Sequence, residues 1–231
     1  MSNKKVLVLL SGGVDSSTCL ALAVNLYGRN NVHTLNIFYG QKHDRELQAA
    51  QDIADYYQVP YRLLDLSNVF AATDCSLLKG SSKQIDHRSY SDQLADLGGE
   101  GTVSTYVPFR NGLMLSAAAS YAQSIGAQLI IYGAHRDDAA GRAYPDCTPE
   151  FVEAMDKCIY EGTGHELHLE APFINSNKAG IVKAGLELNV PYHLTWSCYE
   201  GSDKPCGKCG TCRDRIQAFE LNNVTDPLMT R

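Results

Sequence analysis

A short apolar run that ends in two glycines constrains the fold of this chain more than any other stretch. Residues 6–10 are apolar, Ser11-Gly12-Gly13 follows directly, and Asp15, Ser16 and Ser17 precede a second series of apolar residues. This order predicts a buried parallel strand, a tight turn and the first turn of a helix. Several backbone N–H groups and the positive end of the helix would then surround one point, which is a favourable site for phosphate.

The loop is more specific than an ordinary strand-to-helix turn. Ser-Gly-Gly-x-Asp-Ser resembles the pyrophosphate-binding loop of the N-type ATP pyrophosphatases, and the chain contains no Gly-x-x-x-x-Gly-Lys-[Ser/Thr] Walker loop. The resemblance implies cleavage of ATP between the α- and β-phosphates, with transfer of AMP to a substrate oxygen. It argues against a kinase or a motor that acts on the γ-phosphate.

The remaining elements alternate in a way that indicates an α/β fold. Strands are predicted over 32–38, 61–66, 128–133 and 167–169, and helices over 44–57, 149–161, 178–188 and a segment that Asn111 caps and Gly126 ends. This alternation predicts an open parallel sheet with right-handed crossovers and helices on both faces. The composition shows no interdomain linker, so we expect a single domain over 1–231 that includes a metal-binding element at 198–212.

Polar segments follow two of the predicted strands. Residues 39–43 read Tyr-Gly-Gln-Lys-His, and residues 134–147 are dense in ionisable side chains. Open α/β sheets bind ligands at the carboxyl ends of their strands, so both segments are expected beside the phosphate loop. For Lys42 and His43, a solvated loop is an equally good interpretation. Residues 68–105 have loop composition, and we predict that they form a lid over the substrate site.

The composition indicates a globular protein and argues against some classes of partner. The chain has 231 residues, 44% of them apolar, and a net charge of −6. These values are typical of a globular protein with a substantial core, and they argue weakly against a broad nucleic-acid-binding surface. The apolar run at 6–10 is too short for a signal peptide or a membrane span. We therefore expect a cytoplasmic protein with neither a membrane nor a nucleic acid as a direct partner.

Four of the eight cysteines lie within fifteen positions, at Cys198, Cys206, Cys209 and Cys212. Glycines between them allow the sharp turns by which four thiolates converge on a tetrahedral zinc ion. A closed site of this kind is structural and would contribute roughly 10–16 kcal/mol of apparent folding free energy. An iron–sulfur cluster uses the same ligands and is the alternative. A zinc ribbon that binds nucleic acid is less favoured, because acidic and basic residues are mixed around the cysteines.

Taken together, the motifs resemble the QueC family of queuosine-precursor biosynthesis, nearly from end to end. The matching segments are 10–17, 39–43, 107–111, 144–147 and the four cysteines. The chain departs from the familiar members at Phe109, where they have glycine. It departs again at 136–142, where they read close to Glu-Thr-Asp-Phe-Ser-Gly. Both departures lie near the expected purine pocket.

The resemblance implies a reaction, a set of substrates and a fold like that of the adenine nucleotide alpha hydrolases. 7-Carboxy-7-deazaguanine and ammonia would become the nitrile 7-cyano-7-deazaguanine, with ATP consumed to adenylate first the carboxylate and then the amide. ATP is a substrate, Mg²⁺ accompanies it, zinc is structural, and the protein is expected to be a homodimer.

The same resemblance assigns residues to the site. The pyrophosphate donors are Ser11, Gly12, Gly13, Ser16 and Ser17, within an ATP-binding segment of Leu10, Ser11, Gly12, Gly13, Val14, Asp15, Ser16, Ser17, Thr18, Cys19 and Leu20. The candidate catalytic residues are Asp15, which would orient the loop or hold Mg²⁺, and Arg110, which would bind phosphate or carboxylate through two hydrogen bonds. The expected substrate contacts are Tyr39, Gln41, Arg110, Asn111, Asp137, Tyr144 and Asp146.

For several of these residues a simpler interpretation stays open. Asp15 could merely cap its helix. Asp137 and Asp138 could be solvated loop carboxylates. Lys178 could reach phosphate from the start of its helix or be solvated there, since a cation at that end opposes the helix dipole.

Two other functions are compatible with the loop. A tRNA-thiolating or lysidine-forming enzyme would use the same adenylation step, but the acidic balance and the lack of an added RNA-binding domain count against it. A non-catalytic ATP-binding regulator with a zinc ribbon would leave the charged segments at the strand ends without a role.

Overall fold

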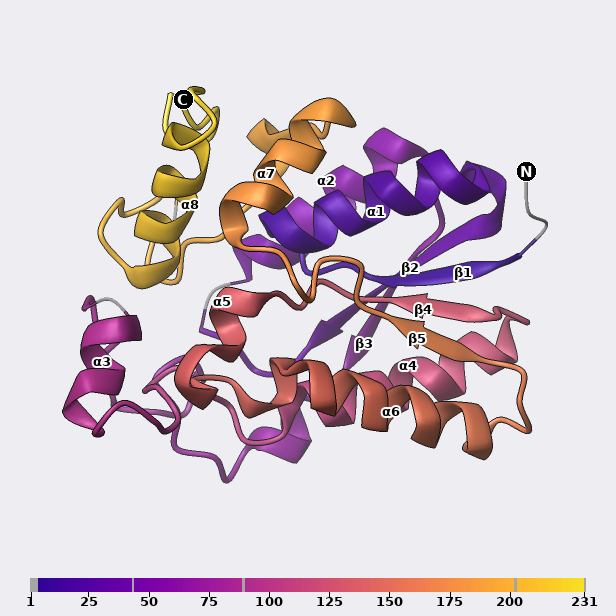
Figure 1. Cartoon of the computed structure of the whole chain (residues 1–231), viewed down its shortest axis with the longest axis horizontal. Coiled ribbons are helices and arrows are strands. Elements are labelled where there is room, and N and C mark those ends of the chain that lie inside the picture. Colours follow the sequence, from indigo (N-terminus) through magenta and orange to yellow (C-terminus); the bar gives the residue numbers. More distant parts are fainter. Residues whose placement is uncertain (1–3, 43, 89, 202, 231) are drawn as a thin grey trace.

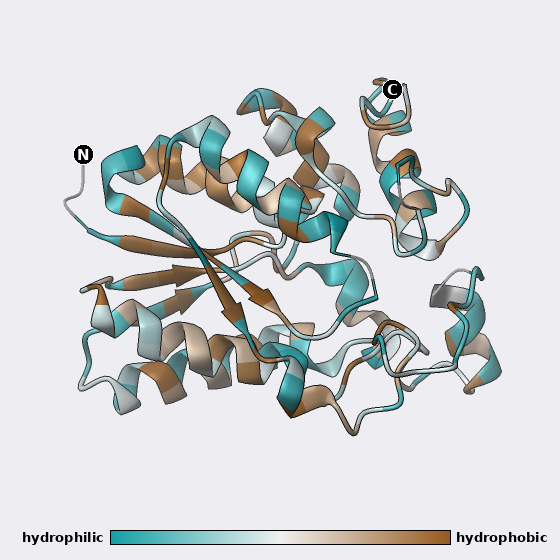
Figure 2. Ribbon diagram, turned by 180° about the vertical axis from the view of Figure 1, so that it is seen from behind, coloured by the Kyte–Doolittle hydropathy of each residue, from teal (hydrophilic) through white to brown (hydrophobic). Residues whose placement is uncertain are grey.

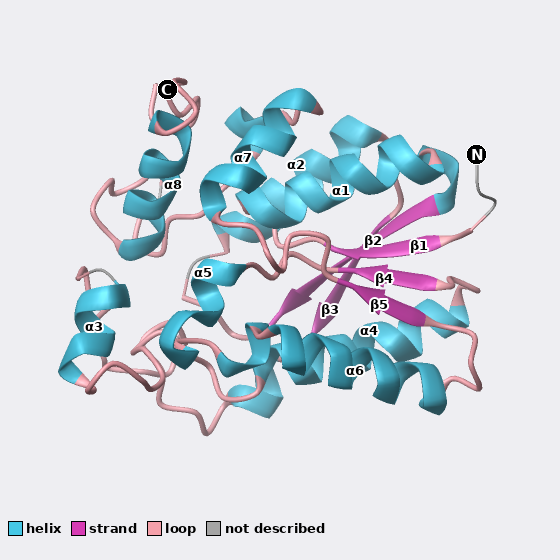
Figure 3. Cartoon of the chain, in the orientation of Figure 1, coloured by secondary structure: helices cyan, strands magenta, loops and turns pink. Residues whose placement is uncertain are grey.

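The computed structural model describes residues 4–42, 44–88, 90–201 and 203–230, so the prediction for His43 lies outside the described residues. Five parallel strands form one sheet in the order β3-β2-β1-β4-β5 (Figures 1 and 3). The strands are β1 (Val6–Leu9), β2 (Val32–Phe38), β3 (Tyr61–Asp65), β4 (Leu129–Ile131) and β5 (His168–Glu170). The predicted open parallel sheet is confirmed.

Helices cover both faces of the sheet, as predicted. One face carries α1 (Val14–Tyr27), α2 (Arg45–Tyr57) and α7 (Lys178–Glu187), and the other carries α4 (Arg110–Ser124) and α6 (Pro149–Gly162) (Figure 1). Alternation along β1 divides its side chains between two cores. Val6 and Val8 pack toward α1, whereas Leu7 packs with Leu115 and Ile159 of the opposite layer. Strands buried on both faces are hydrophobic along their length, as Figure 2 shows in brown.

The other elements of the described chain are α3 (Tyr90–Asp96), α5 (Arg136–Ala139), α8 (Gly210–Glu220) and five 3-10 helices at Arg29–Asn31, Ser67–Phe70, Ala140–Arg142, Pro145–Cys147 and Tyr192–Leu194 (Figure 1). Among them, α3, α5 and α8 lie toward the carboxyl ends of the strands, whereas the 3-10 helix at Arg29–Asn31 directly precedes β2. Among the described residues, no helix has the length and apolar character that crossing a membrane requires.

Three of these α-helices were not predicted: α3, α8 and the four-residue α5. Helix α3 lies inside the segment 68–105, which was expected to be a loop; it has seven residues, and Leu94 is its buried apolar anchor. Helix α8 begins directly after Cys209, and its Arg215 is fully buried against Asp226. Neither α3 nor α8 has the repeated apolar stripe that would show it in the sequence.

The predicted helix cap at Asn111 is wrong. Helix α4 begins at Arg110, and Phe109 takes the N-cap position with a left-handed φ of 52°. The carboxylate of Asp146 accepts a hydrogen bond from the Asn111 backbone N–H at 2.8 Å. An aspartate from a distant segment therefore satisfies the helix end that Asn111 was expected to cap.

Candidate active site

Two adjoining cavities open at the carboxyl ends of β1, β2 and β4. The larger has a volume of about 590 Å³ and extends from the phosphate loop to α7 and α8. The smaller, of about 250 Å³, follows the ends of β1 and β2. Residues common to both linings are Ser11, Asp15, Glu46, Arg110, Asp138, Cys147 and Tyr199. We refer to the two cavities together as the cleft.

The phosphate loop has the conformation that its sequence predicts. Gly12 has a φ of +83°, and a Cβ atom there would lie 2.6 Å from the Glu46 carbonyl oxygen, so the position requires glycine. Gly13 is the N-cap of α1. The Ser11 and Ser16 hydroxyls lie 3.0 Å apart. The Ser17 hydroxyl is fully buried, has no hydrogen-bond partner in the described part of the chain and lines neither cavity.

The end of the predicted ATP-binding segment lies away from the cleft. Thr18 donates to the Val14 carbonyl and lies 2.8 Å from the Tyr192 hydroxyl, while Cys19 and Leu20 are fully buried in the core under α1. None of these three residues lines either cavity. Their position gives them a packing role behind the loop, while their contact with ATP stays a prediction.

Asp15 is held by two basic groups that come from distant parts of the chain. Its Oδ2 lies 2.5 Å from Lys178 Nζ and 3.7 Å from His135 Nε2. Burial raises the pKa of Asp15, but Lys178 and His135 outweigh that effect, and the pKa is below its ordinary value. The cap interpretation of Asp15 is wrong because Gly13 is the N-cap. The solvated interpretation of Lys178 is also wrong, since its ammonium group is directed into the site.

Further carboxylates surround this ion pair. Asp138 Oδ2 lies 3.3 Å from His135 Nε2, and Asp137 accepts a hydrogen bond from the Lys178 backbone N–H at 2.9 Å. Asp214 of α8 lines the larger cavity with them, and burial raises its pKa above the ordinary value. Asp15 Oδ1 is buried with no partner among the residues described. This set of oxygen donors fits Mg²⁺ bound to phosphate.

Arg110 stands at the boundary between the two cavities. Its guanidinium group lies 5.0 Å above the Tyr39 ring and donates to the Tyr39 hydroxyl at 3.3 Å. No carboxylate of the described chain forms an ion pair with it. A cation in the first turn of a helix is unfavourable, so the position is better explained by a bound anion than by helix stability.

The other predicted substrate contacts divide into two groups. Tyr39, Gln41 and Asn111 line the smaller cavity, and Asp137 and Tyr144 line the larger one. Asp146 lines neither; it is 3% exposed, and its carboxylate accepts from the start of α4. In this structure Asp146 positions the helix that carries Arg110.

Two residues that line both cavities, Glu46 and Tyr199, were not predicted from the sequence. Glu46 lies in the first turn of α2, and burial raises its pKa to about 7 although Arg110 acts to lower it. Tyr199 follows the first cysteine of the cluster. Glu46 could have been predicted as a site residue, because it lies in the first turn of a helix that follows a polar strand end. Nothing in the local sequence marks Tyr199 as a site residue, because only the folding of the cysteine region places it beside the cleft.

The four cysteines converge as predicted. All four Sγ atoms lie within 4.8 Å of one another. Cys198 Sγ accepts from the backbone N–H groups of Gly201 at 3.0 Å and Cys206 at 3.2 Å. Hydrogen bonds to sulfur of this kind stabilise the thiolate form of a ligand. The donor set fits a structural metal centre, and four sulfurs suit zinc or an iron–sulfur cluster.

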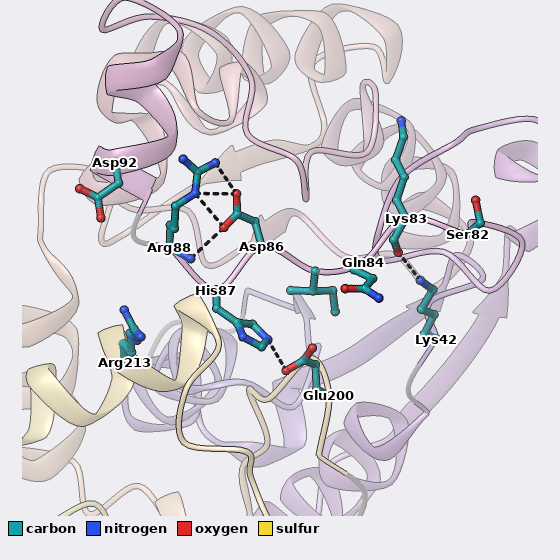
Figure 4. A pocket seen from close by; sticks show the side chains of 11 residues that line it. Lys42, Ser82, Lys83, Gln84, Asp86, His87, Arg88, Asp92, Glu200 and Arg213 are labelled. Atoms are coloured by element: carbon teal, nitrogen blue, oxygen red, sulfur yellow. Dashed lines mark hydrogen bonds and ion pairs between the residues drawn. The ribbon is translucent and has the colours of Figure 1, made fainter.

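A third cavity, of about 880 Å³, lies outside the cleft between residues 82–92 and the cysteine region (Figure 4). His87 Nε2 lies 2.7 Å from Glu200 Oε2 and connects the two sides. Leu94 of α3 lines the larger cavity of the cleft. The segment predicted to be a lid therefore reaches both the cleft and the cysteine region, while its movement stays a prediction.

Comparison with solved structures supports the fold. NMN synthetase from Francisella tularensis aligns with a TM-score of 0.52 at 15% identity, covering 96% of this chain and 78% of that one. The U34-tRNA thiolase NcsA from Methanococcus maripaludis, solved with its [4Fe-4S] cluster, aligns with a TM-score of 0.52 at 16% identity, covering 96% of this chain and 68% of that one. At these identities the likeness shows the fold alone.

Comparison of sequences shows the family. The model of the family described as "Queuosine biosynthesis protein QueC" matches residues 5–223. A 7-cyano-7-deazaguanine synthase from Oceanobacillus iheyensis is 42% identical and covers 99% of both chains. Another, from Archaeoglobus fulgidus, is 42% identical over 98% of this chain and 90% of its own length. The predicted resemblance is confirmed, and the chain belongs to the QueC family of queuosine biosynthesis proteins.

Proposed function

We propose that this chain is a 7-cyano-7-deazaguanine synthase, which uses ATP to convert 7-carboxy-7-deazaguanine and ammonia into the nitrile. The observation that carries the proposal is the joining of the phosphate loop and Arg110 in one cleft, in a chain 42% identical to synthases of that name. ATP and a small planar acid are then neighbours, as adenylation requires.

In the first half-reaction, a carboxylate oxygen of the substrate attacks the α-phosphorus of ATP and pyrophosphate leaves. The loop N–H groups and the Ser11 and Ser16 hydroxyls hydrogen-bond to phosphate oxygens, and Lys178 neutralises part of their charge. Asp15, with Asp137 and Asp138 nearby, would hold Mg²⁺, which screens the phosphates when it is bound. Arg110 orients the substrate carboxylate and then the acyl phosphate.

In the second half-reaction, ammonia attacks the acyl carbon, a C–N bond forms and AMP leaves with the electrons of the C–O bond. The amide oxygen then attacks the α-phosphorus of a second ATP and pyrophosphate leaves. Loss of AMP and of two protons from the adenylated amide gives the nitrile. The same purine pocket holds the substrate during the adenylation of the carboxylate and during that of the amide. For this pocket we propose Tyr39, Gln41, Asn111, Asp137, Tyr144 and the more deeply placed Asp146.

The remaining proposals concern the metal, the oligomeric state and the cellular location. We assign zinc to the four cysteines, because a closed set of four thiolates with peptide N–H donors suits a structural ion. A homodimer and a cytoplasmic location follow from the family resemblance and from a thiol cluster that needs reducing conditions.

The test is an assay of the purified protein with ATP, ammonium and 7-carboxy-7-deazaguanine. We expect AMP, pyrophosphate and the nitrile to form together. Turnover with a tRNA but not with the acid would replace the proposal by a tRNA-modifying activity. ATP binding without pyrophosphate release under any condition would support a regulator.

A further inference from the structure

Glu46 lies at the junction of the two cavities of the cleft. It belongs to the first turn of α2, and its own backbone carbonyl lies against Gly12 of the phosphate loop. Its side chain lines both cavities of the cleft, as do Ser11 and Arg110. A group that borders both the phosphate end and the Arg110 end is close to the junction where AMP and the acid are joined.

Glu46 differs from the other carboxylates of this junction. Three carboxylate residues line both cavities: Asp15, Glu46 and Asp138. Asp15 is paired with Lys178, and Asp138 lies against His135. Within the described chain Glu46 has neither a hydrogen bond nor an ion pair from its side chain. A carboxylate without a fixed partner keeps its basicity and has room for a ligand that donates a hydrogen bond.

Titratable groups of both signs surround the junction at which Glu46 lies. The cation that acts on Glu46 is Arg110 of α4. The other titratable groups that line the same cavities as Glu46 are Asp15, Tyr39, Asp137, Asp138, His135, Tyr132, Tyr144, Cys147, Lys178, Tyr199 and Asp214. Burial is the largest effect on Glu46 and raises its pKa to about 7, which Arg110 opposes. A carboxylate of this basicity can accept a proton near neutral pH, where free ammonia is scarce and ammonium is abundant.

We propose that Glu46 is the catalytic base that receives the proton of the nitrogen nucleophile, so that ammonium taken from solution attacks as ammonia. The inference rests on the proposed function. Ammonium gives one proton to the Glu46 carboxylate. The nitrogen lone pair then forms the C–N bond with the acyl carbon, the acyl C–O bond breaks toward AMP, and a second proton passes from the nitrogen to solvent to give the amide. The proton leaves Glu46 to solvent before the next round.

The test compares two nucleophiles in the Glu46→Gln variant. Hydroxylamine is unprotonated at neutral pH and traps an acyl adenylate as the hydroxamate without prior loss of a proton. We expect the variant to form amide from ammonium about 100-fold or more slowly than the parent protein, but to form hydroxamate at nearly the parent rate. The ammonium deficit should shrink as the pH rises, because free ammonia replaces ammonium in solution.

The controls separate this inference from the proposed function. Asp44→Asn changes an exposed carboxylate at the start of the same helix and should leave both reactions unchanged. Exchange of labelled pyrophosphate into ATP, with the acid present and ammonium absent, reports adenylation alone. If the parent protein shows no exchange, the proposed function fails.

Three results in the Glu46→Gln variant would overturn the role of Glu46 while leaving the proposed function intact. They are full amide formation from ammonium, an equal loss with both nucleophiles, and a loss of pyrophosphate exchange. The last result would assign Glu46 to adenylation or to the purine edge.

Discussion

The phosphate loop and the cysteine region both border the larger cavity, yet different forces hold them in place. The loop lies between β1 and α1, whose apolar residues are buried in a continuous core. The cysteine region packs few apolar side chains, chiefly Trp196 and Leu228, around its sulfur atoms. Hydrophobic burial alone therefore positions the loop, whereas α8 and its Asp214 are held by the burial of Ala218 and Phe219 together with a buried ion pair and the converging cysteines. A substitution that weakens the cysteine region should therefore disturb the α8 side of the cleft more than the phosphate loop, and a substitution at the loop should do the reverse.

The largest expected effect is loss of the metal. Replacing Cys209 by Ser should lower the apparent stability of the cysteine region by up to about 10 kcal/mol, because metal-binding free energy is folding free energy there. We expect α8 to lose protection in hydrogen exchange while β1 and α1 keep theirs, together with loss of bound metal in elemental analysis. The control is Cys158→Ser, an exposed cysteine of α6 outside the cluster. Simultaneous loss of protection in β1 would show that the two regions unfold as one unit.

The second largest effect is expected from loss of the buried ion pair between Arg215 and Asp226, which connects α8 to the C-terminal segment. Arg215 donates to Asp226 through Nε at 2.7 Å and through a terminal nitrogen at 2.9 Å, and both side chains are almost fully buried. Arg215→Ala should cost about 3–5 kcal/mol, because it leaves Asp226 buried and unpaired. The double variant Arg215→Met with Asp226→Leu should recover most of that loss in denaturant unfolding. No recovery would mean that the hydrogen bonds of Arg215 to Thr195 and Tyr192 matter more than the charge pair.

On the loop side, Asp15→Asn should reduce activity far more than stability. Removal of its charge leaves Lys178 uncompensated and weakens the magnesium site, so pyrophosphate release should fall roughly 100- to 1,000-fold. Metal content at the cysteines should not change, since Asp15 lies outside that region. Unchanged pyrophosphate release in the variant would remove Asp15 from the catalytic residues.

Glu46 should give the loop side a pH dependence of stability that lies between the two pKa values of its carboxyl group. Because burial raises its pKa from 4.5 to about 7, the folded state binds a proton more tightly than the unfolded state does. Its contribution to stability is present below the lower value and is lost as the pH rises through the upper one. The stability of Glu46→Gln relative to the parent should therefore increase across this window and then level off. A difference in melting temperature that stays constant with pH would contradict the assignment.

The smallest effect is expected at Phe109, which adjoins Arg110. Its left-handed φ of 52° favours glycine, while its ring packs at 6.2 Å from that of Phe151. Phe109→Gly relieves the strain as it removes the ring, whereas Phe109→Ala removes the ring and keeps the strain. The glycine variant should be more stable than the alanine variant by about 1 kcal/mol in thermal unfolding. The opposite order would show that the backbone relaxes when the ring is absent.

Local patterns in the sequence were enough to predict much of the fold. A strand of Val and Leu followed by Ser-Gly-Gly could bury itself only inside a parallel sheet, and four closely spaced cysteines could converge only through tight turns. Helices α3 and α8 were missed because their stability comes from a few anchors, Leu94 in one and Arg215 in the other, rather than from a repeated apolar stripe.

The sequence by itself determined the phosphate loop, the parallel sheet, the cysteine cluster and, through its motifs, the family. The tertiary structure alone decided which charges meet in the cleft. Lys178 lies 163 positions from Asp15, and no pattern shorter than the whole fold pairs them. The whole fold also decides the surroundings of Asp146 and Glu46. The Asp146 carboxylate accepts a hydrogen bond at the start of α4, whereas the Glu46 side chain has no hydrogen-bond or ion-pair partner among the described residues. Hydrophobic periodicity is local and can be read along a chain, whereas the ionisation of a buried group depends on neighbours that only folding brings together.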